Sequence, residues 1–90
     1  TLIDGRDIEN WKAAVLPNTK GFFFETPANP TLDLVDIAAV TALAKQHGIR
    51  TVVDNVFATP MLQRPLEHGA DIVVYSATKH IDGQGRCLGG

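Results

Sequence analysis

Three short apolar runs recur along the chain, and segments with helical spacing separate them. The runs cover residues 21–25, 49–54 and 70–75. Continuous apolar runs of this length, bounded by turn-forming residues, predict strands. Because the first run does not alternate between apolar and polar residues, we expect that strand to be buried on both faces. Strands that alternate with helices indicate βαβ units, so the sequence predicts an α/β fold with a parallel sheet and covering helices.

The segments between these runs have the pattern of helices. One apolar stripe consists of Ile37, Val40, Leu43 and Ala44. These positions share one face of a helix, for which Thr31 or Asp33 is the expected N-cap. Asp4 is the expected N-cap of a shorter helix over residues 6–14, and a short helical segment is expected over residues 65–68.

The composition is that of an ordinary globular segment. The chain has 90 residues, of which 44% are hydrophobic, and its 8 basic and 10 acidic side chains give a net charge of −2. These values argue against disorder, and the absence of a basic excess argues against nucleic acid or an anionic membrane as partners. No apolar run approaches the roughly 20 residues that span a bilayer. The single cysteine and the three histidines show no disulfide or metal-ligand pattern, so we expect no metal and a reducing, cytoplasmic compartment.

The two ends of the chain suggest a piece of a longer protein. The sequence begins at Thr1 rather than at methionine and stops at Gly89-Gly90. A chain of this length buries only about 60% of its unfolded surface. No linker or repeat divides it, so we expect residues 1–90 to be a fragment of a single α/β domain.

Polar side chains follow each of the three predicted strands. They are Asn29 after the first, Asp54 at the end of the second, and Ser76, Thr78 and Lys79 after the third. In open parallel sheets, ligands bind beyond the carboxyl ends of the strands. We therefore expect an amide, a carboxylate, two hydroxyls and an amine to lie along one edge of the sheet.

Each of these residues has both a structural and a functional interpretation. Asp54 could accept hydrogen bonds within its loop or pair with a protonated ring nitrogen, since a carboxylate that leaves an apolar strand needs a cation or strong donors. Lys79 could be a solvated surface residue or a nucleophile that forms a Schiff base with an aldehyde. Ser76 and Thr78 could cap a loop or donate to a phosphate, and Asn29 could form a turn or donate to a ligand oxygen.

Three motifs in order carry a family resemblance. They are ETPANP at 25–30, VVDN at 52–55 and YSATK at 75–79. Together they resemble the cystathionine γ-synthase family of Cys/Met metabolism, whose enzymes depend on pyridoxal 5'-phosphate (PLP) and have the aspartate-aminotransferase-type fold, fold type I. The resemblance covers nearly the whole chain. The stretch KHIDGQGR at 79–86 is similar to the O-succinylhomoserine sulfhydrylase branch of that family.

The resemblance implies a role for each candidate residue. Lys79 would be the catalytic lysine that holds PLP as a Schiff base, and Asp54 would pair with the pyridinium nitrogen. Ser76 and Thr78 would contact the cofactor phosphate, and Asn29 would contact the phenolic oxygen. The 90 residues would then belong to the large PLP-binding domain.

The resemblance also implies a reaction. The parent enzyme would perform γ-replacement on an O-acylhomoserine, with O-succinylhomoserine and sulfide giving homocysteine in methionine biosynthesis. In the family, a ring-stacking tyrosine lies upstream of these motifs, the arginine for the substrate carboxylate lies downstream, and a neighbouring subunit completes the site. We therefore expect the isolated chain to be inactive and the parent to be a homotetramer.

Other interpretations stay open. The parent could have cystathionine γ-synthase or methionine γ-lyase activity within the same family. A non-catalytic α/β module that binds phosphate would also explain the polar edge, and a purely structural fragment is compatible with the sequence.

Overall fold

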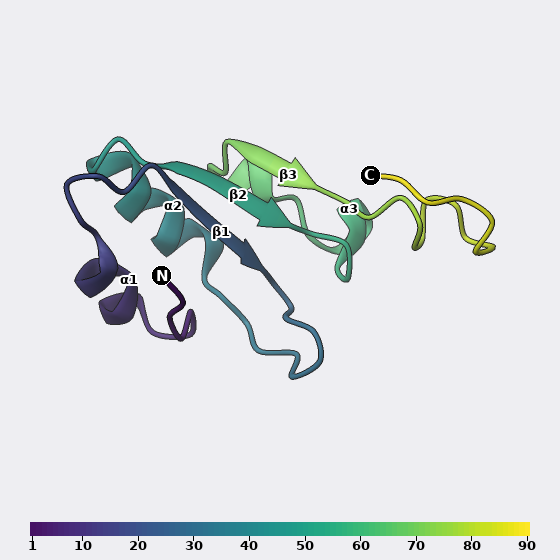
Figure 1. The fold of residues 1–90 in the computed structure, drawn as a ribbon, viewed down its shortest axis with the longest axis horizontal. Helices are drawn as coiled ribbons and strands as arrows, with labels where there is room; N and C mark the ends of the chain where they lie inside the picture. The colour runs from purple at the N-terminus through teal and green to yellow at the C-terminus, as the bar shows by residue number, and fades with distance from the viewer.

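The computed structural model describes all 90 residues (Figure 1). In chain order the elements are α1 (Ile8–Ala14), β1 (Gly21–Glu25), α2 (Ile37–Gln46), β2 (Arg50–Asp54), α3 (Thr59–Leu62), the 3-10 helix η1 (Pro65–His68) and β3 (Ile72–Val74). The molecule measures 43 × 24 × 22 Å and is elongated because the residues after β3 extend beyond the sheet. None of its helices has the length and hydropathy needed to cross a membrane.

The three strands form one parallel sheet in the order β1-β2-β3. Glu25 pairs with Asp54, and Asp54 pairs with Val74, so the three strands finish level with one another. Parallel neighbours require crossover connections, which α2 supplies between β1 and β2, and which α3 and η1 supply between β2 and β3. The predicted α/β fold with a parallel sheet is confirmed.

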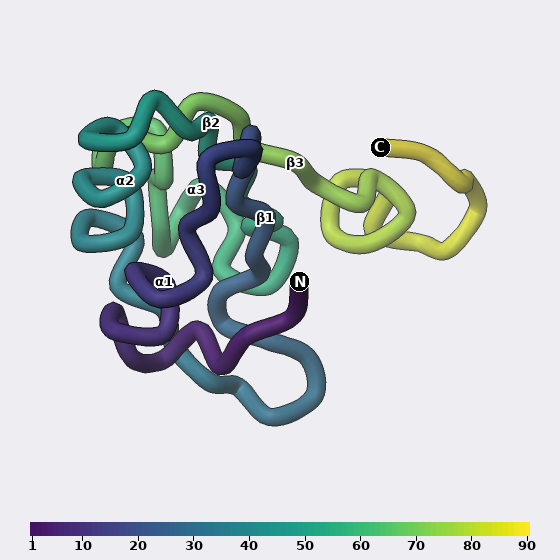
Figure 2. The backbone as a smooth tube through the Cα atoms, turned by 60° about the vertical axis from the view of Figure 1, so that its left-hand side comes forward, coloured from purple at the N-terminus to yellow at the C-terminus, as the bar shows by residue number.

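The core lies between this sheet and the helices α1 and α2, which cover the same face (Figure 2). The predicted stripe of α2 faces inward, and all four of its apolar residues are buried. From α1, Trp11 meets Phe22 and Phe24 of β1 edge-on, with ring centroids 5.0 and 5.3 Å apart. Edge-to-face aromatic pairs of this kind add to the free energy gained by burial.

The expectation that β1 is buried on both faces is wrong for this chain. Phe22 and Phe24 are buried, but Phe23 between them is 68% exposed. Phe23, Val52 and Ile72 are register partners and form a row on the face opposite the helices. On that face Phe23 and Ile72 are exposed and Val52 is half-buried, so successive residues of β1 alternate between core and surface.

Both predicted N-caps are also wrong by a few residues. Asp7, not Asp4, caps α1 by accepting a hydrogen bond from the backbone nitrogen of Glu9 at 3.0 Å. Asp36, not Thr31 or Asp33, caps α2 by accepting from the backbone nitrogen of Ala39 at 3.0 Å. In both cases two acidic residues precede the helix, and the one that lies directly before the first helical residue takes the cap.

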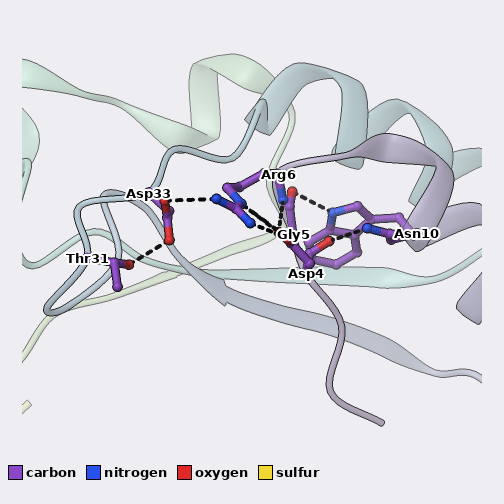
Figure 3. Close-up of polar contacts among 7 residues, drawn as sticks. Asp4, Gly5, Arg6, Asn10, Thr31 and Asp33 are labelled. Atoms are coloured by element: carbon purple, nitrogen blue, oxygen red, sulfur yellow. Dashed lines mark hydrogen bonds and ion pairs between the residues drawn. The ribbon is translucent and has the colours of Figure 1, made fainter.

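Asp4 and Asp33, which cap neither helix, instead flank Arg6 (Figure 3). Arg6 donates through Nη2 to Asp4 Oδ2 at 2.6 Å, and its Nη1 lies 3.6 Å from Asp33 Oδ1. The hydrogen bonds that Arg6 donates to Asp4 from its guanidinium and its backbone nitrogen lower the pKa of Asp4 to about 2. Thr31 donates its hydroxyl proton to Asp33 at 2.7 Å. Arg6 therefore links the N-terminal segment to the loop that follows β1.

The amino ends of β2 and β3 are fixed by hydrogen bonds between Thr51 and Asp71 and by a glycine turn. Thr51 donates from its backbone nitrogen and its hydroxyl to Asp71 Oδ2 at 2.7 and 3.0 Å, and Asp71 N donates back to Thr51 Oγ1 at 3.1 Å. These bonds lower the pKa of Asp71. Just before β3, Gly69 has a φ of +93°, and a Cβ there would lie 2.8 Å from Lys45 Nζ. The bend that starts β3 therefore favours glycine.

Candidate functional site

The predicted site residues lie at or beyond the carboxyl edge of the sheet. Asp54 is the last residue of β2 and is level with Glu25 and Val74 at the ends of the flanking strands. Asn29 lies four residues past the end of β1, and residues 76–90, which we call the arm, follow β3 (Figure 1). The expectation that three strand ends share one edge is confirmed.

Asp54 is half-buried and has one oxygen available. Its Oδ1 accepts a hydrogen bond from the backbone nitrogen of Val56 at 3.0 Å. No hydrogen bond occupies Oδ2, and Asp54 takes part in none of the ion pairs of the structure. The free oxygen of Asp54 can therefore accept a hydrogen bond from a donor that approaches the carboxyl edge of the sheet.

Lys79 lies in a turn of the arm with an exposed side chain. Its backbone nitrogen donates to Ser76 O at 3.1 Å, and its backbone oxygen accepts from Gly83 N at 2.9 Å. Its amine forms no ion pair with any acidic residue. Hydrogen bonds within the arm therefore hold the backbone of Lys79, while its amine forms no ion pair.

Ser76 and Thr78 lie at the base of the arm and are half-buried. Gly89 crosses this base: its oxygen accepts from Ala77 N at 2.8 Å, and its nitrogen donates to Thr78 Oγ1 at 3.1 Å. The Thr78 hydroxyl thus accepts one bond and keeps its own proton for another acceptor.

Asn29 is exposed in the loop between β1 and α2. Its backbone nitrogen donates to Glu25 Oε2 at 3.0 Å, which holds the loop against the end of β1. No hydrogen bond or ion pair joins any two of Asn29, Asp54 and Lys79. Asp54 ends one strand, and Asn29 and Lys79 follow the ends of the two flanking strands.

Comparison with known proteins settles the family. The family model described as Cys/Met metabolism PLP-dependent enzyme matches residues 1–90. The chain belongs to this family. The resemblance noted in its three motifs is therefore confirmed, and so is PLP as the cofactor on which the family depends.

Relatives within the Cys/Met metabolism family carry several activities. The O-succinylhomoserine sulfhydrylase of Mycobacterium tuberculosis is 59% identical over 89 residues, which cover 99% of this chain and 22% of that protein. The O-succinylhomoserine sulfhydrylase of Pseudomonas aeruginosa is 57% identical over 84 residues, covering 93% of this chain and 21% of that protein. The L-methionine gamma-lyase of Treponema denticola is 51% identical over 92 residues, which cover 100% of this chain and 23% of that protein. The chain thus spans about a fifth of the length of these relatives, and membership establishes the cofactor rather than one reaction.

A solved structure gives the same fold. The cystathionine gamma-lyase from Lactobacillus plantarum, crystallised with L-serine, superimposes with a TM-score of 0.95 at 42% identity. The match covers 98% of this chain and 23% of that chain. The expected fold type I architecture is confirmed for these residues.

The side chains at the edge fit the chemistry of the family's cofactor. The half-buried carboxylate of Asp54 suits a protonated ring nitrogen, because an opposite charge favours the charged form. The amine of Lys79 suits an aldehyde. Hydroxyls such as those of Ser76 and Thr78 donate to phosphate oxygens, and the side-chain amide of Asn29 suits a phenolic oxygen. The assignment of each group to each residue stays a prediction.

Sequence analysis missed a buried polar cluster directly beneath these residues. Asn55 is fully buried, and Gln63 hydrogen-bonds both to its side chain and to the backbone oxygen of Thr26. Gln63 has no periodic context in the sequence that would indicate burial. The only available signal was a second polar residue directly after Asp54, at the end of an apolar strand.

Proposed function

We propose that the protein carrying this chain is a PLP-dependent transferase that replaces the γ-substituent of an O-acylhomoserine. The substrates are O-succinylhomoserine and sulfide, and the products are homocysteine, as methionine biosynthesis requires, and succinate, which leaves from the γ-carbon. The observation that carries this proposal is 59% identity with a relative named O-succinylhomoserine sulfhydrylase over 99% of the chain. We place the enzyme in the cytoplasm, in keeping with its single cysteine.

Asp54 and Lys79 perform the central tasks in this proposal. PLP, when bound, supplies the electron sink for the reaction. The negative charge of Asp54 keeps the cofactor's ring nitrogen protonated, because a nearby opposite charge raises the pKa of that nitrogen. Lys79 holds the cofactor aldehyde, and its amine, once released, moves protons between substrate carbons as a general base and acid.

The other three residues orient the cofactor. Ser76 and Thr78 donate hydroxyl protons to the phosphate, which fixes one end of the ring. Asn29 donates from its side-chain amide to the phenolic oxygen, which fixes a second position. Three contacts from two loops restrain the ring in one orientation, and orientation is a large part of the protein's contribution to catalysis.

The 90 residues provide only part of the proposed site. We propose that they are a fragment of a single PLP-binding domain and that the parent is a homotetramer. The chain spans 22% of the length of its sulfhydrylase relative. The isolated chain is therefore expected to show no turnover, and turnover by the purified 90 residues would contradict this.

The test uses the full-length protein and borohydride, which reduces a Schiff base to a stable amine. We expect mass spectrometry to find PLP on Lys79 in the wild type. Lys79→Ala should lose the label and the activity, while Lys20→Ala, which removes an exposed lysine outside the edge, should retain both. A label on a different lysine would contradict the assignment, and a non-catalytic phosphate-binding module would give no label.

A second candidate reaction is elimination, supported by the 51% identity with an L-methionine gamma-lyase. Cystathionine γ-synthase activity is a third, since a protein named as a probable cystathionine gamma-synthase is also 51% identical. Product analysis of the full-length enzyme separates the three. Homocysteine from O-succinylhomoserine and sulfide supports the first, cystathionine from cysteine supports synthase activity, and thiol release from methionine supports the lyase.

A further inference from the structure

A closed hydrogen-bonded cluster lies beneath the carboxyl edge of the sheet. It consists of Thr26, Asn55, Gln63 and Tyr75, which we call the edge network. Asn55 Nδ2 donates to Gln63 O at 2.8 Å and to the Tyr75 hydroxyl at 2.9 Å. Gln63 Nε2 donates to Asn55 Oδ1 and to Thr26 O, each at 2.8 Å. No fully buried side-chain nitrogen or oxygen lacks a partner, so every such atom of the network is paired.

Each member of the edge network follows a different element. Thr26 comes directly after β1, Asn55 after β2, Gln63 after α3 and Tyr75 after β3. Backbone bonds reinforce these links, since Asn55 N donates to Val74 O at 3.1 Å. The network therefore ties all three strand ends to one another at the edge.

The edge network also adjoins both halves of the predicted cofactor site. Asn55 is the residue after Asp54, and Tyr75 is the residue before the arm that carries Lys79. The ring of Tyr75 meets His80 of the arm edge-on, with centroids 5.8 Å apart. Tyr75 thus contacts the network through its hydroxyl and the arm through its ring.

We propose that the edge network is a positioning device that fixes Asp54 relative to the arm, and hence to Lys79. This inference rests on the proposed function. Apolar side chains could fill the same space without the cost of burying polar groups. A buried polar network instead favours the one geometry in which every donor and acceptor is met, and a site that holds a small ring between two groups needs such a fixed separation.

The test compares two full-length variants that each lose one hydroxyl. Tyr75→Phe removes an acceptor from the network and keeps the ring beside His80. The control, Thr51→Val, removes a buried hydroxyl from the opposite end of β2. Visible circular dichroism per mole of bound PLP reports the orientation of the cofactor ring, and titration gives the Kd for PLP. Tyr75→Phe should weaken the dichroic band and raise the Kd by about five-fold, the effect of one hydrogen bond, and Thr51→Val should change neither.

A second variant and the wild type complete the test. Asn55→Ala removes the central member and should shift both readouts further in the same direction. If Asn55→Ala does not fold, as thermal melting would show, Tyr75→Phe decides alone. A dichroic band and a Kd in Tyr75→Phe that match those of Thr51→Val would overturn the inference. Failure of the wild type to take up PLP would overturn the proposed function itself, so the two failures are distinguishable.

Discussion

Residues 1–75 and the arm share the predicted cofactor site but are held in different ways. The first part has a core of ten buried residues between the sheet and two helices. The arm has no buried residue, and its bonds close within itself, as between Gly89 and Thr78. No hydrogen bond or ion pair in the structure links the arm to residues 1–75. Asp54 therefore ends a strand that is packed in the core, whereas Lys79 is positioned by local turns and by Tyr75.

The difference predicts that apolar truncations have a large effect on stability in residues 1–75 and a negligible effect in the arm. Phe24→Ala should lower the free energy of unfolding by about 3–5 kcal/mol, because it opens a cavity against Trp11. Leu88→Ala should change it by less than about 0.5 kcal/mol, because that arm side chain is 95% exposed. Urea denaturation of the 90-residue chain in a stabilising osmolyte, followed by Trp11 fluorescence, measures both. Equal effects of the two substitutions would show that the arm shares the core.

The charge on the packed side of the site should matter for activity rather than for folding. Asp54→Asn in the full-length protein should lower kcat/KM by about 100-fold. Without the negative charge of Asp54, the pKa of the cofactor's ring nitrogen should fall by about two units. Glu67→Gln, which removes an exposed carboxylate paired with Arg64, should leave kcat/KM unchanged. Steady-state kinetics at saturating PLP measures both. An Asp54→Asn enzyme of normal activity would remove Asp54 from the proposed machinery.

The same difference explains how much of the fold could be predicted. The helix of Val40 and Leu43 and the strand that ends at Asp54 follow from local periodicity and were predicted correctly. The exposure of Phe23 could not be predicted, because an apolar run does not reveal which part of a chain covers each face. The caps Asp7 and Asp36 were missed because neighbouring acidic residues compete for the role, and only backbone geometry decides between them.

The predictability of the site also differed between features set by strand topology and features set by long-range polar contacts. The level strand ends at Glu25, Asp54 and Val74 followed from parallel topology, which places all strand ends together. The burial and hydrogen bonding of Gln63 and Asn55 could not be predicted from the sequence. Their contacts join residues 26, 55, 63 and 75, which follow separate elements. Long-range polar pairing leaves no periodic trace in a sequence.

The amino end of the sheet should respond to acid. Hydrogen bonds from Thr51 lower the pKa of Asp71 below its ordinary value of 3.8. A lowered pKa means that the ionised form stabilises the fold above pH 3.8, and that this contribution is lost as pH falls through the lowered value. Urea midpoints of the full-length protein should therefore fall more steeply in acid than those of Asp71→Asn. Parallel acid profiles for the two proteins would show that the Thr51 contacts contribute nothing.

The smallest effect is expected within the arm. Asp82 Oδ2 accepts from the backbone nitrogens of Arg86 and Gln84 at 2.8 and 3.2 Å, and these bonds lower its pKa. Asp82→Ala should speed amide hydrogen exchange in residues 80–90 of the full-length protein without changing exchange in β2, because no hydrogen bond or ion pair joins the arm to β2. The contrast between variant and wild type should shrink as pH falls through the lowered pKa, where the wild-type carboxylate also loses its charge. Hydrogen-exchange mass spectrometry resolves the two peptides, and faster exchange in β2 would mean that the hydrogen bonds of Asp82 also stabilise the sheet.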